Sequence, residues 1–487
     1  MFVKNLVIGS GFAGRTVASH LGDSVLIIDR GEKLDHSIVM ERRSAGEGGS
    51  AVFRSALPWN SFSRLSKICA SYYPMIVGGA SNAWGGNTRR LPPGTFERTD
   101  APIAWPLSYR ELLPWYEKAE IRLNLTGDPA YAGTRLTNTT SGFEQWRYAL
   151  RPYFDSIGLS AIAINTGSNG QFGQGTCKGR SNCETCYEDA KARPDNIFPE
   201  MPILPSTQCL EIIFDGARAK SAVCYNGREV FEIEFERCVI AANGIESPAI
   251  LLRSELPEKV RTHSIGKYLQ DHAHFEVQCI GAYELPYNST GAFGHVYIDE
   301  LAGEYSGIEV SCFALTHESA LEPLNDTLPD ISHVWNDGAP LSSISRRIIS
   351  FYFELEIPAT ELIKIFLNDD GSPQLEDAEY LSFLPQYEEA RKKIIEKLER
   401  RGLKVMSQQC HYRGGYGGHH FAGTLNMGVG PNAVCDESAR VIGTENLYVA
   451  GTSLIPRAGG EGPTLTAVAL AERLGHHLST QDLRIDD

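Results

Sequence analysis

The first thirty residues alternate between short apolar runs and polar or glycine-rich turns. Residues 2–8 are an apolar run of strand length, residues 15–21 have the composition of a helix, and residues 24–28 form a second apolar run. Short apolar runs bounded by turn residues are typical of buried strands. The pattern therefore predicts a strand, a helix and a second strand, as in a parallel α/β sheet.

The turn after the first predicted strand has glycine at three spaced positions. Gly9, Gly11 and Gly14 fit the pattern G-x-G-x-x-G, and Asp29 follows twenty residues after Gly9. In such a turn the first glycine permits the tight bend, the second lets a pyrophosphate approach, and the third lets helix and strand pack closely. The helix N-terminus offers free N–H groups to phosphates, and an acid at this distance accepts hydrogen bonds from a ribose. The pattern predicts a dinucleotide site without separating FAD from NAD.

Two further kinds of periodicity occur in the second half of the chain. Residues 276–280 and 308–312 alternate polar and apolar side chains, which predicts half-buried strands. Within residues 385–402, apolar side chains recur at helical spacing between charged ones. The apolar positions are Tyr387, Ala390, Ile394, Ile395 and Leu398. This segment predicts a helix that lies on a sheet and turns its charged face to solvent.

Composition and charge exclude several classes of protein. The 487 residues are 42% hydrophobic and 22% charged, which is ordinary for a globular chain and excludes disordered and fibrous classes. The net charge of −15, with no run of basic residues, argues against nucleic-acid binding and against an anionic membrane surface. No stretch approaches the ~20 apolar residues of a membrane helix.

The cysteines and the N-terminus bear on the compartment. The chain begins directly with the first predicted strand and lacks the pattern of a signal peptide. Its eleven cysteines are an odd number, so at least one is unpaired in a monomer. We therefore expect a cytoplasmic protein, in which clustered cysteines bind metal or do redox chemistry more often than they form structural bridges.

Several segments resemble, in the same order, the signatures of the glucose-methanol-choline (GMC) family of flavin oxidoreductases. They are residues 78–86, 239–248 and 265–272, and the C-terminal stretches 420–428, 446–451 and 463–466. A disulfide-reductase-like flavoprotein shares the N-terminal pattern, but the redox cysteine pair and the second G-x-G-x-x-G that it requires are both missing. The resemblance therefore implies FAD. Residues 78–86 contain no His, so the covalent His–flavin link of some relatives is not expected.

The resemblance also implies an α/β architecture with two domains. A discontinuous Rossmann-like FAD-binding domain would comprise residues 1–104, 195–275 and 411–487. An α+β substrate domain on a mainly antiparallel sheet would comprise residues 105–194 and 276–410, including a cysteine loop at 177–186. The implied cofactor-binding residues are Gly9, Gly11, Phe12, Ala13, Gly14, Asp29, Arg30, Gly79, Ser81, Asn82, Trp84, Gly85, Gly86, Ala242, Gly244, Gly451, Pro463 and Thr464.

The candidate catalytic base is a histidine near the C-terminus. Hydride transfer from an alcohol carbon to flavin N5 needs a group that takes the hydroxyl proton, and an imidazole titrates near working pH. In the family this base is the His of a His-x-x-Gly-Thr segment, which here is His420. His419 beside it would point to the opposite face of an extended strand.

One position of the family's site departs from the pattern. An Asn or His usually precedes Pro-Thr-Leu-Thr, but this chain has Gly462 there. Three explanations stay open: Glu461 fills the space as a candidate catalytic residue, water or the substrate supplies the contact, or the reaction is not ordinary alcohol oxidation.

Three cysteines gather in a short loop. Cys177, Cys183 and Cys186 have the spacing C-x5-C-x2-C, and thiolates so spaced can converge on a metal. The loop resembles that of bacterial FAD-dependent sugar dehydrogenases, which carry a three-iron iron-sulfur cluster on C-x5-C-x3-C. Here the interval between Cys183 and Cys186 is one residue shorter than in those proteins. A redox disulfide and three free thiols therefore remain as alternatives.

The sequence thus favours an FAD-dependent dehydrogenase that oxidises a hydroxyl group, on a sugar, cyclitol or similar polyol by analogy with the cysteine loop. It would pass electrons to an external acceptor or redox partner, and an oxidase is less favoured. A flavin-dependent lyase or isomerase that returns its electrons within each turnover is one alternative. A non-catalytic flavin electron-transfer protein is another.

Overall fold

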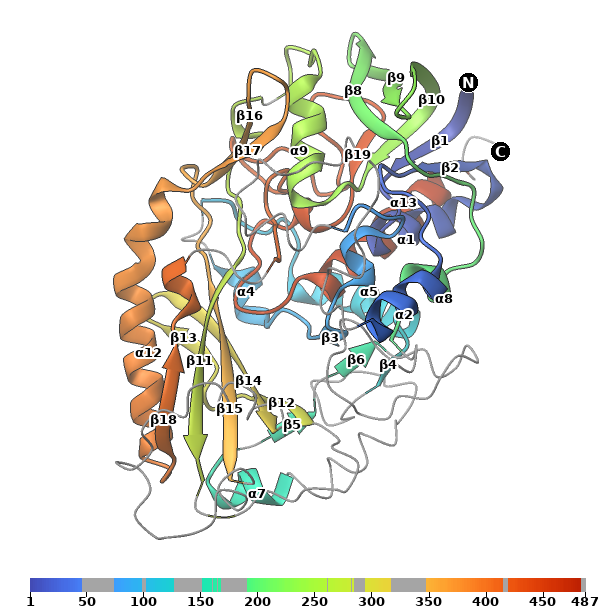
Figure 1. The fold of residues 1–487 in the computed structure, drawn as a ribbon. Coiled ribbons are helices and arrows are strands. Elements are labelled where there is room, and N and C mark those ends of the chain that lie inside the picture. The colour runs from blue at the N-terminus through green and yellow to red at the C-terminus, as the bar shows by residue number, and fades with distance from the viewer. Residues whose placement is uncertain are drawn as a thin grey trace.

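The structure is a computed structural model of the chain. It describes residues 1–45, 74–98, 102–126, 151–159, 161–163, 165–167, 191–260, 262–281, 283, 294–316, 347–414 and 419–482. These residues form a mixed α/β protein with two large sheets, each beside its own apolar core (Figure 1). The predicted α/β class is therefore confirmed.

The first sheet collects strands from distant parts of the chain. Its order is β7 (Ile203–Leu204), β2 (Val25–Ile28), β1 (Phe2–Ile8), β10 (Val230–Ile240), β9 (Arg218–Tyr225) and β8 (Gln208–Asp215), with β19 (Leu447–Val449) also paired to β10. The strands β7, β2, β1, β10 and β19 pair in parallel, whereas β8, β9 and β10 form an antiparallel meander. The predicted strands at the N-terminus are β1 and β2.

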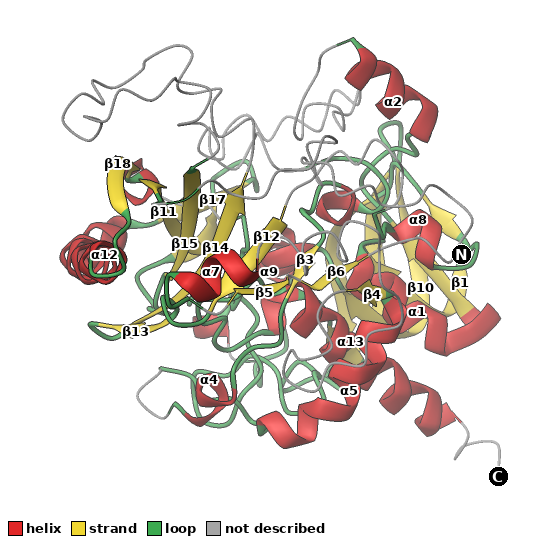
Figure 2. Ribbon diagram, turned by 90° about the horizontal axis from the view of Figure 1, so that it is seen from below, coloured by secondary structure: helices red, strands yellow, loops and turns green. Residues whose placement is uncertain are grey.

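Helices cover this sheet and meet one another. The helix α1 (Phe12–Leu21) follows β1 directly and packs on the C-terminal helix α13 (Thr464–Asp482), which in turn packs on α5 (Tyr109–Arg122). The three helices lie close together in Figure 2. The helix α1 begins at Phe12, three residues before the predicted start, because the turn of Gly9 and Gly11 leads straight into it.

The second sheet is antiparallel throughout. Its order is β18 (Lys404–Gln409), β11 (His272–Ile280), β15 (Ile348–Glu356), β14 (Ile308–Thr316), β12 (Gly294–Ile298) and β5 (Ala161–Ala163), with β13 (Gly303–Tyr305) paired to β14. The strands predicted at 276–280 and 308–312 are parts of β11 and β14.

The two faces of the second sheet differ in polarity. Successive side chains of a strand point to opposite faces, and one face buries Phe275, Phe353 and other apolar residues under α12 (Leu384–Glu399). The helix α12, seen end-on in Figure 2 beside β18 and β11, is the amphipathic helix predicted within 385–402. The opposite face carries polar side chains such as His272 and Glu356, and the first sheet with its helices lies on that side (Figure 1).

The remaining elements connect these layers. They are α2 (His36–Ser44), β3 (Asn87–Thr88), α4 (Pro93–Glu97), β4 (Leu125–Thr126), α7 (Arg151–Ser156), β6 (Asn165–Gly167), α8 (Pro194–Ile197), α9 (Asn243–Arg253), β16 (Lys364–Leu367) and β17 (Pro373–Glu376). None of the helices within the described ranges has the length and apolar character needed to span a membrane. The division into the two predicted domains stays a prediction.

Candidate active site

The turn between β1 and α1 is packed so closely that it admits only glycine at key positions. Gly9 has φ +108°, and a Cβ atom there would lie 2.4 Å from the carbonyl oxygen of Ala241. At Gly14 a Cβ would lie 2.0 Å from the carbonyl oxygen of Gly9. The first turn of α1 therefore sits directly on β1 and on the end of β10. A cradle of this kind fits the pyrophosphate of a dinucleotide.

The second glycine-rich segment, residues 78–86, lies against this turn. The hydroxyl of Ser81 accepts a hydrogen bond from the N–H of Phe12 at 3.0 Å, and the Phe12 and Trp84 rings meet edge to face at 5.1 Å. A Cβ at Gly451 would lie 3.6 Å from the Ala13 side chain. Further predicted cofactor residues in the same segment are Gly79, Asn82, Gly85 and Gly86. Three distant segments thus converge at the start of α1.

Asp29 is engaged by its own surroundings. Its carboxylate accepts hydrogen bonds from the Ser10 N–H at 2.9 Å, from the Ser10 hydroxyl, and from the Gly31 N–H at 2.7 Å. Burial raises its pKa, and these hydrogen bonds oppose the rise. The next residue, Arg30, forms an ion pair with Glu246 of α9 at 3.0 Å. Asp29 therefore stabilises the glycine turn, and its predicted contact with a ribose stays a prediction.

Lys191 ends the Ala190-Lys191 pair that resembles the Ala-Lys after the cysteine loop of bacterial FAD-dependent sugar dehydrogenases, although the sequence assigned it no role. It is buried, and its ammonium donates to the carbonyl oxygens of Asn82 at 2.9 Å and Trp84 at 2.7 Å. The Trp84 indole N–H donates in return to the Ala192 carbonyl at 2.8 Å. The Ala-Lys resemblance is the signal that marks this position, whereas hydrogen bonds to backbone carbonyls leave no spacing pattern in a sequence.

The segment that follows His420 crosses the beginning of α9. Ala242 is the residue before this helix, and a Cβ at Gly244 would lie 2.2 Å from the carbonyl oxygen of Phe421. The hydroxyl of Thr424 donates to the Gly244 carbonyl at 2.7 Å. The glycine at 244 therefore permits a close approach that fixes the C-terminal segment on the first sheet.

His420 is held through both its backbone and its ring. One carboxylate oxygen of Asp271 accepts from the His420 N–H at 2.6 Å, and the other accepts from the His419 N–H at 3.2 Å. The Nδ1 of His420 lies 2.8 Å from the Nδ1 of His272, whose Nε2 lies 2.9 Å from the Gly459 carbonyl oxygen. Sequence reasoning did not single out Asp271 or His272, although both lie in the family-like segment 265–272.

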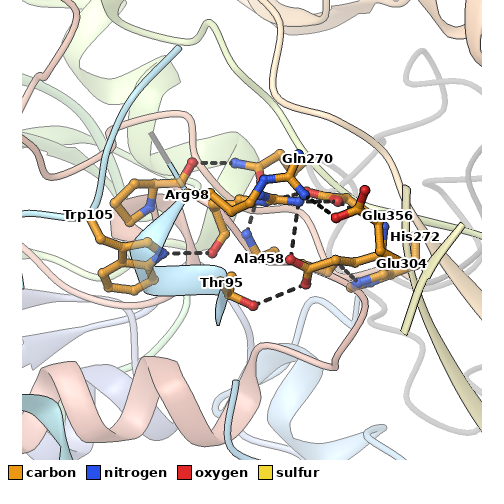
Figure 3. Close-up of polar contacts among 12 residues, drawn as sticks. Thr95, Arg98, Trp105, Gln270, His272, Glu304, Glu356 and Ala458 are labelled. Carbon is orange, nitrogen blue, oxygen red and sulfur yellow. Dashed lines mark hydrogen bonds and ion pairs between the residues drawn. The ribbon is translucent and has the colours of Figure 1, made fainter. Parts of the chain in front are cut away.

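The loop before α13 is pinned to the second sheet by a dense set of contacts (Figure 3). Gln270 donates to the Pro456 carbonyl at 2.9 Å and accepts from the Ala458 N–H at 2.9 Å. The guanidinium of Arg457 makes two hydrogen bonds of 2.6 Å to Glu356. The Trp105 indole donates to the Arg457 carbonyl at 3.2 Å. These contacts fix the position of Gly459 and of the residues after it.

Gly462 lies beside the ring of His420. A Cβ at Gly462 would stand 3.6 Å from Cε1 and 3.7 Å from Nε2 of His420, in ordinary van der Waals contact. The neighbouring Glu461 forms an ion pair with Arg89 at 3.1 Å, and Arg89 also pairs with Asp299 at 2.6 Å. Burial raises the pKa of Glu461 to about 7, and Arg89 opposes the rise. Glu461 is thus held by Arg89, and its catalytic role stays a prediction.

The histidines around His420 are uncharged at neutral pH. Burial lowers the pKa of His272, His274 and His419 to about 4. Burial also lowers the pKa of His420, and the three neighbouring imidazoles add to the effect. A neutral imidazole has one nitrogen lone pair free to accept a proton. His420 therefore has the protonation state that a general base needs.

The polar face of the second sheet places carboxylates near these histidines. Glu354 of β15 lies opposite His274 of β11. Burial raises the pKa of Glu354 to about 8, and the charges of Glu461 and Asp271 add to the rise. By contrast, the neighbouring Glu356 is neutralised by Arg457. Glu354 is therefore a carboxyl group that a cation placed beside it would cause to ionise.

The donor set of Asp271, His272 and His420 invites a test for a metal. Their ligand atoms all lie within 4.8 Å of one another. However, both oxygens of Asp271 accept backbone N–H groups, and His272 is engaged at both ring nitrogens. Hydrogen bonds thus account for the whole arrangement.

The cysteine loop cannot be placed in this way, because Cys177, Cys183 and Cys186 lie outside the described residues. In the part of the chain that the structure describes, the cysteines are free thiols: Cys209, Cys224, Cys238, Cys279, Cys312, Cys410 and Cys435. An iron-sulfur cluster therefore stays a prediction.

Comparison with known proteins supplies the family context. Residues 385–471 match the model of the GMC oxidoreductase family. The chain is 24% identical to 6'''-hydroxyparomomycin C oxidase of Streptomyces lividus, over 97% of this chain and 91% of that protein. It is 26% identical to paromamine 6'-oxidase of Streptomyces fradiae, over 96% of this chain and 90% of that protein.

A solved structure shares the fold. The crystal structure of pyridoxine 4-oxidase from Mesorbium loti superposes with a TM-score of 0.60 and 16% identity, covering 98% of this chain and 99% of that one. The matched family segment contains His420, Gly451, Pro463 and Thr464, which are four of the predicted site residues.

The close packing at the glycine turn can be tested with a matched pair of glycines. In Gly14→Ala the new methyl would lie 2.0 Å from the Gly9 carbonyl oxygen, whereas at Gly94 no atom lies within 4 Å of a new Cβ. We expect Gly14→Ala to lose bound FAD and to melt at a lower temperature. Gly94→Ala should match the parent in flavin absorbance per chain and in melting temperature. Full flavin content in Gly14→Ala would exclude this turn as the dinucleotide site.

Proposed function

We propose that the chain is a GMC oxidoreductase that oxidises a hydroxyl group of a sugar, cyclitol or similar polyol, which the match of residues 385–471 to the family model supports. The observation that carries the proposal is His420: a neutral imidazole beside Gly462, with a hydrogen-bond partner at Nδ1. Among the described residues, no group hydrogen-bonds to its Nε2, which is therefore available to a substrate.

FAD would be held by the turn of Gly9, Gly11 and Gly14 and by the segments packed around it. When bound, FAD supplies the acceptor for the hydride that leaves the carbinol carbon. The discontinuous FAD-binding domain of residues 1–104, 195–275 and 411–487 is part of this proposal. It is supported by β1, β2, β10 and β19, which these segments contribute to the first sheet. The remaining residues would form the substrate domain.

The role of His420 is to take the proton of the substrate hydroxyl at Nε2. The hydroxyl donates a hydrogen bond to this nitrogen, and the proton moves to it as the C–H bond breaks. His272 remains at Nδ1 and accepts the N–H of the imidazolium that forms. Gly462 leaves space beside Nε2 where the family usually has an Asn or His side chain. The contact of that missing residue would come from water or from another group of the substrate.

The polar face of the second sheet favours a substrate that carries an amino group. Burial raises the pKa of Glu354, two neighbouring carboxylates add to the rise, and no cation is among the causes. An ammonium group beside it would relieve that repulsion. The two relatives compared above are named as oxidases of 6'''-hydroxyparomomycin C and of paromamine, and homologues of this kind oxidise hydroxyl groups of sugars and aminoglycosides. An aminated sugar or cyclitol is therefore the substrate class that we propose first.

The destination of the electrons is a separate part of the proposal. The sequence favours a dehydrogenase with an external acceptor or redox partner, on the basis of Cys177, Cys183 and Cys186. The relatives named above are called oxidases, which favours oxygen as the acceptor. Iron and sulfide analysis of anaerobically purified protein, with oxygen-uptake assays, separates the two cases.

Anaerobic addition of an aminated polyol tests the reaction class. Net oxidation should bleach the flavin absorbance lastingly and yield a carbonyl product. Product formation without lasting bleaching would instead favour a lyase or isomerase that returns its electrons. A spectrum unchanged by every alcohol would favour a non-catalytic electron-transfer protein.

The role of His420 can be separated from that of its neighbour. We expect His420→Ala to lower the rate of flavin reduction by about 10²–10⁴-fold, the usual loss for a general base. The adjacent His419→Ala is the control and should stay within a few fold of the parent, because the ring that bonds to His272 is that of His420. Stopped-flow absorbance measures both rates. Equal rates in the parent and His420→Ala would remove His420 from the mechanism.

Recognition of an amino group predicts a specific effect at Glu354. At neutral pH, KM should be lower for an aminated polyol than for its neutral analogue, and Glu354→Gln should remove about 10–100-fold of that preference. Because the pKa of Glu354 is about 8 in the free enzyme, cation binding releases a proton. The preference should therefore increase as pH rises towards 8. A preference that survives Glu354→Gln unchanged would place the amine elsewhere.

A further inference from the structure

His272 is a fully buried histidine with a hydrogen-bonding partner at each ring nitrogen. It has no exposed surface and begins β11, the strand beside β15 in the second sheet. Its Nε2 lies 2.9 Å from the Gly459 carbonyl oxygen and its Nδ1 lies 2.8 Å from the Nδ1 of His420. The two imidazole rings meet at an angle of 80°. Figure 3 shows His272 near Gln270 and Glu356, among the residues that hold the Gly459 loop.

The partner at Nε2 determines where the proton of His272 resides. A carbonyl oxygen only accepts hydrogen bonds, so the Nε2 of His272 must carry hydrogen. Burial lowers the pKa of this ring to about 4, so at neutral pH it has a single N–H. The Nδ1 of His272 is therefore unprotonated and can accept a hydrogen bond through its lone pair.

The unprotonated Nδ1 of His272 determines the tautomer of His420. A contact of 2.8 Å between two nitrogens requires one donor, and since the Nδ1 of His272 can only accept, the Nδ1 of His420 must donate. The His420 ring is also neutral, because burial and the neighbouring imidazoles lower its pKa. Its remaining nitrogen, Nε2, is then unprotonated. That nitrogen lies 3.7 Å from the position that a Cβ of Gly462 would take.

The anchor of this chain is rigid. Gly459 belongs to the loop held by Gln270 and by the Arg457–Glu356 ion pair. Asp271, next to His272 in sequence, holds the backbone N–H of His420 at 2.6 Å. The backbone and the ring of His420 are thus fixed by two consecutive residues of one segment.

We infer that His272 is a positioning residue that holds His420 as the Nδ1–H tautomer, with the Nε2 lone pair directed to the space beside Gly462. The inference deepens the proposed function, on which its catalytic meaning rests. Without His272, a neutral His420 would be free to carry its hydrogen on Nε2, where it could not accept the substrate proton.

Two substitutions separate the two contacts of His272. In His272→Asn the amide oxygen can stand near the position of Nδ1 and accept from His420, although the donor to Gly459 is lost. In His272→Gln the amide nitrogen can reach the position of Nε2 and donate to Gly459, although the acceptor for His420 is lost. We expect His272→Gln to lower kcat by about 10²–10⁴-fold with little change in KM. His272→Asn should retain most of the parent's kcat.

A second measurement needs no substrate. In the FAD-loaded protein labelled with ¹⁵N-histidine, we expect His420 to show a protonated Nδ1 and an unprotonated Nε2. The signals are assigned by their loss in His420→Ala. His272→Gln should shift the His420 signals towards the Nε2–H form, and His272→Asn should not. Flavin content and melting temperature report whether each variant is folded. If a variant does not fold, the ¹⁵N spectrum of the parent alone shows which nitrogen of His420 is protonated.

Three results would overturn the inference. They are a protonated Nε2 on His420 in the parent, equal kcat in both His272 variants, or a chelator-sensitive signal at both Nδ1 atoms, which would indicate a shared metal ion. Failure of the proposed function looks different, because a chain that oxidises no alcohol would still show the expected tautomer.

Discussion

The buried ion pair between Arg457 and Glu356 is the interaction on which the arrangement of the site depends. Both side chains are almost inaccessible to solvent, and two hydrogen bonds of 2.6 Å join them. Arg457 belongs to the loop before α13 in the first layer, whereas Glu356 ends β15 in the second sheet. Removing one partner of such a pair leaves an uncompensated buried charge, which costs roughly 3–5 kcal/mol. The pair therefore fixes the two layers relative to each other.

A loop fixed in this way can hold a hydrogen-bond chain in a single direction. The Gly459 carbonyl is an acceptor that cannot change its role, and its position is set by the neighbours of Arg457. Because this oxygen accepts from Nε2 of His272, Nδ1 of His272 must accept from Nδ1 of His420. Burial keeps both rings neutral, so the chain has one proton arrangement. The Gly459 carbonyl oxygen thus determines, through His272, that Nε2 of His420 is unprotonated.

The same region combines neutral imidazoles with excess carboxyl groups. Burial raises the pKa of Asp271 to about 7 and that of Glu354 to about 8, so these acids are partly protonated at neutral pH. Arg89 and Arg457 neutralise other carboxylates on the same side of the sheet. A protonated carboxyl group such as that of Glu354 can gain binding energy from a nearby cation by releasing its proton. This is the electrostatic reason for proposing an aminated substrate.

Local signals in the sequence determined many of the elements. The apolar run of β1, the glycine turn before α1 and the helical spacing of α12 each reflect short-range constraints of packing or backbone geometry, and each is recognisable without neighbours. The segment with His420 was recognisable by its resemblance to a family. The roles of Arg457 and His272 were not recognisable, because each depends on a residue more than a hundred positions away. Only the tertiary structure brings the Gly459 carbonyl, His272, His420 and Gly462 together. No spacing along the chain encodes the hydrogen bonds that determine the tautomer of His420.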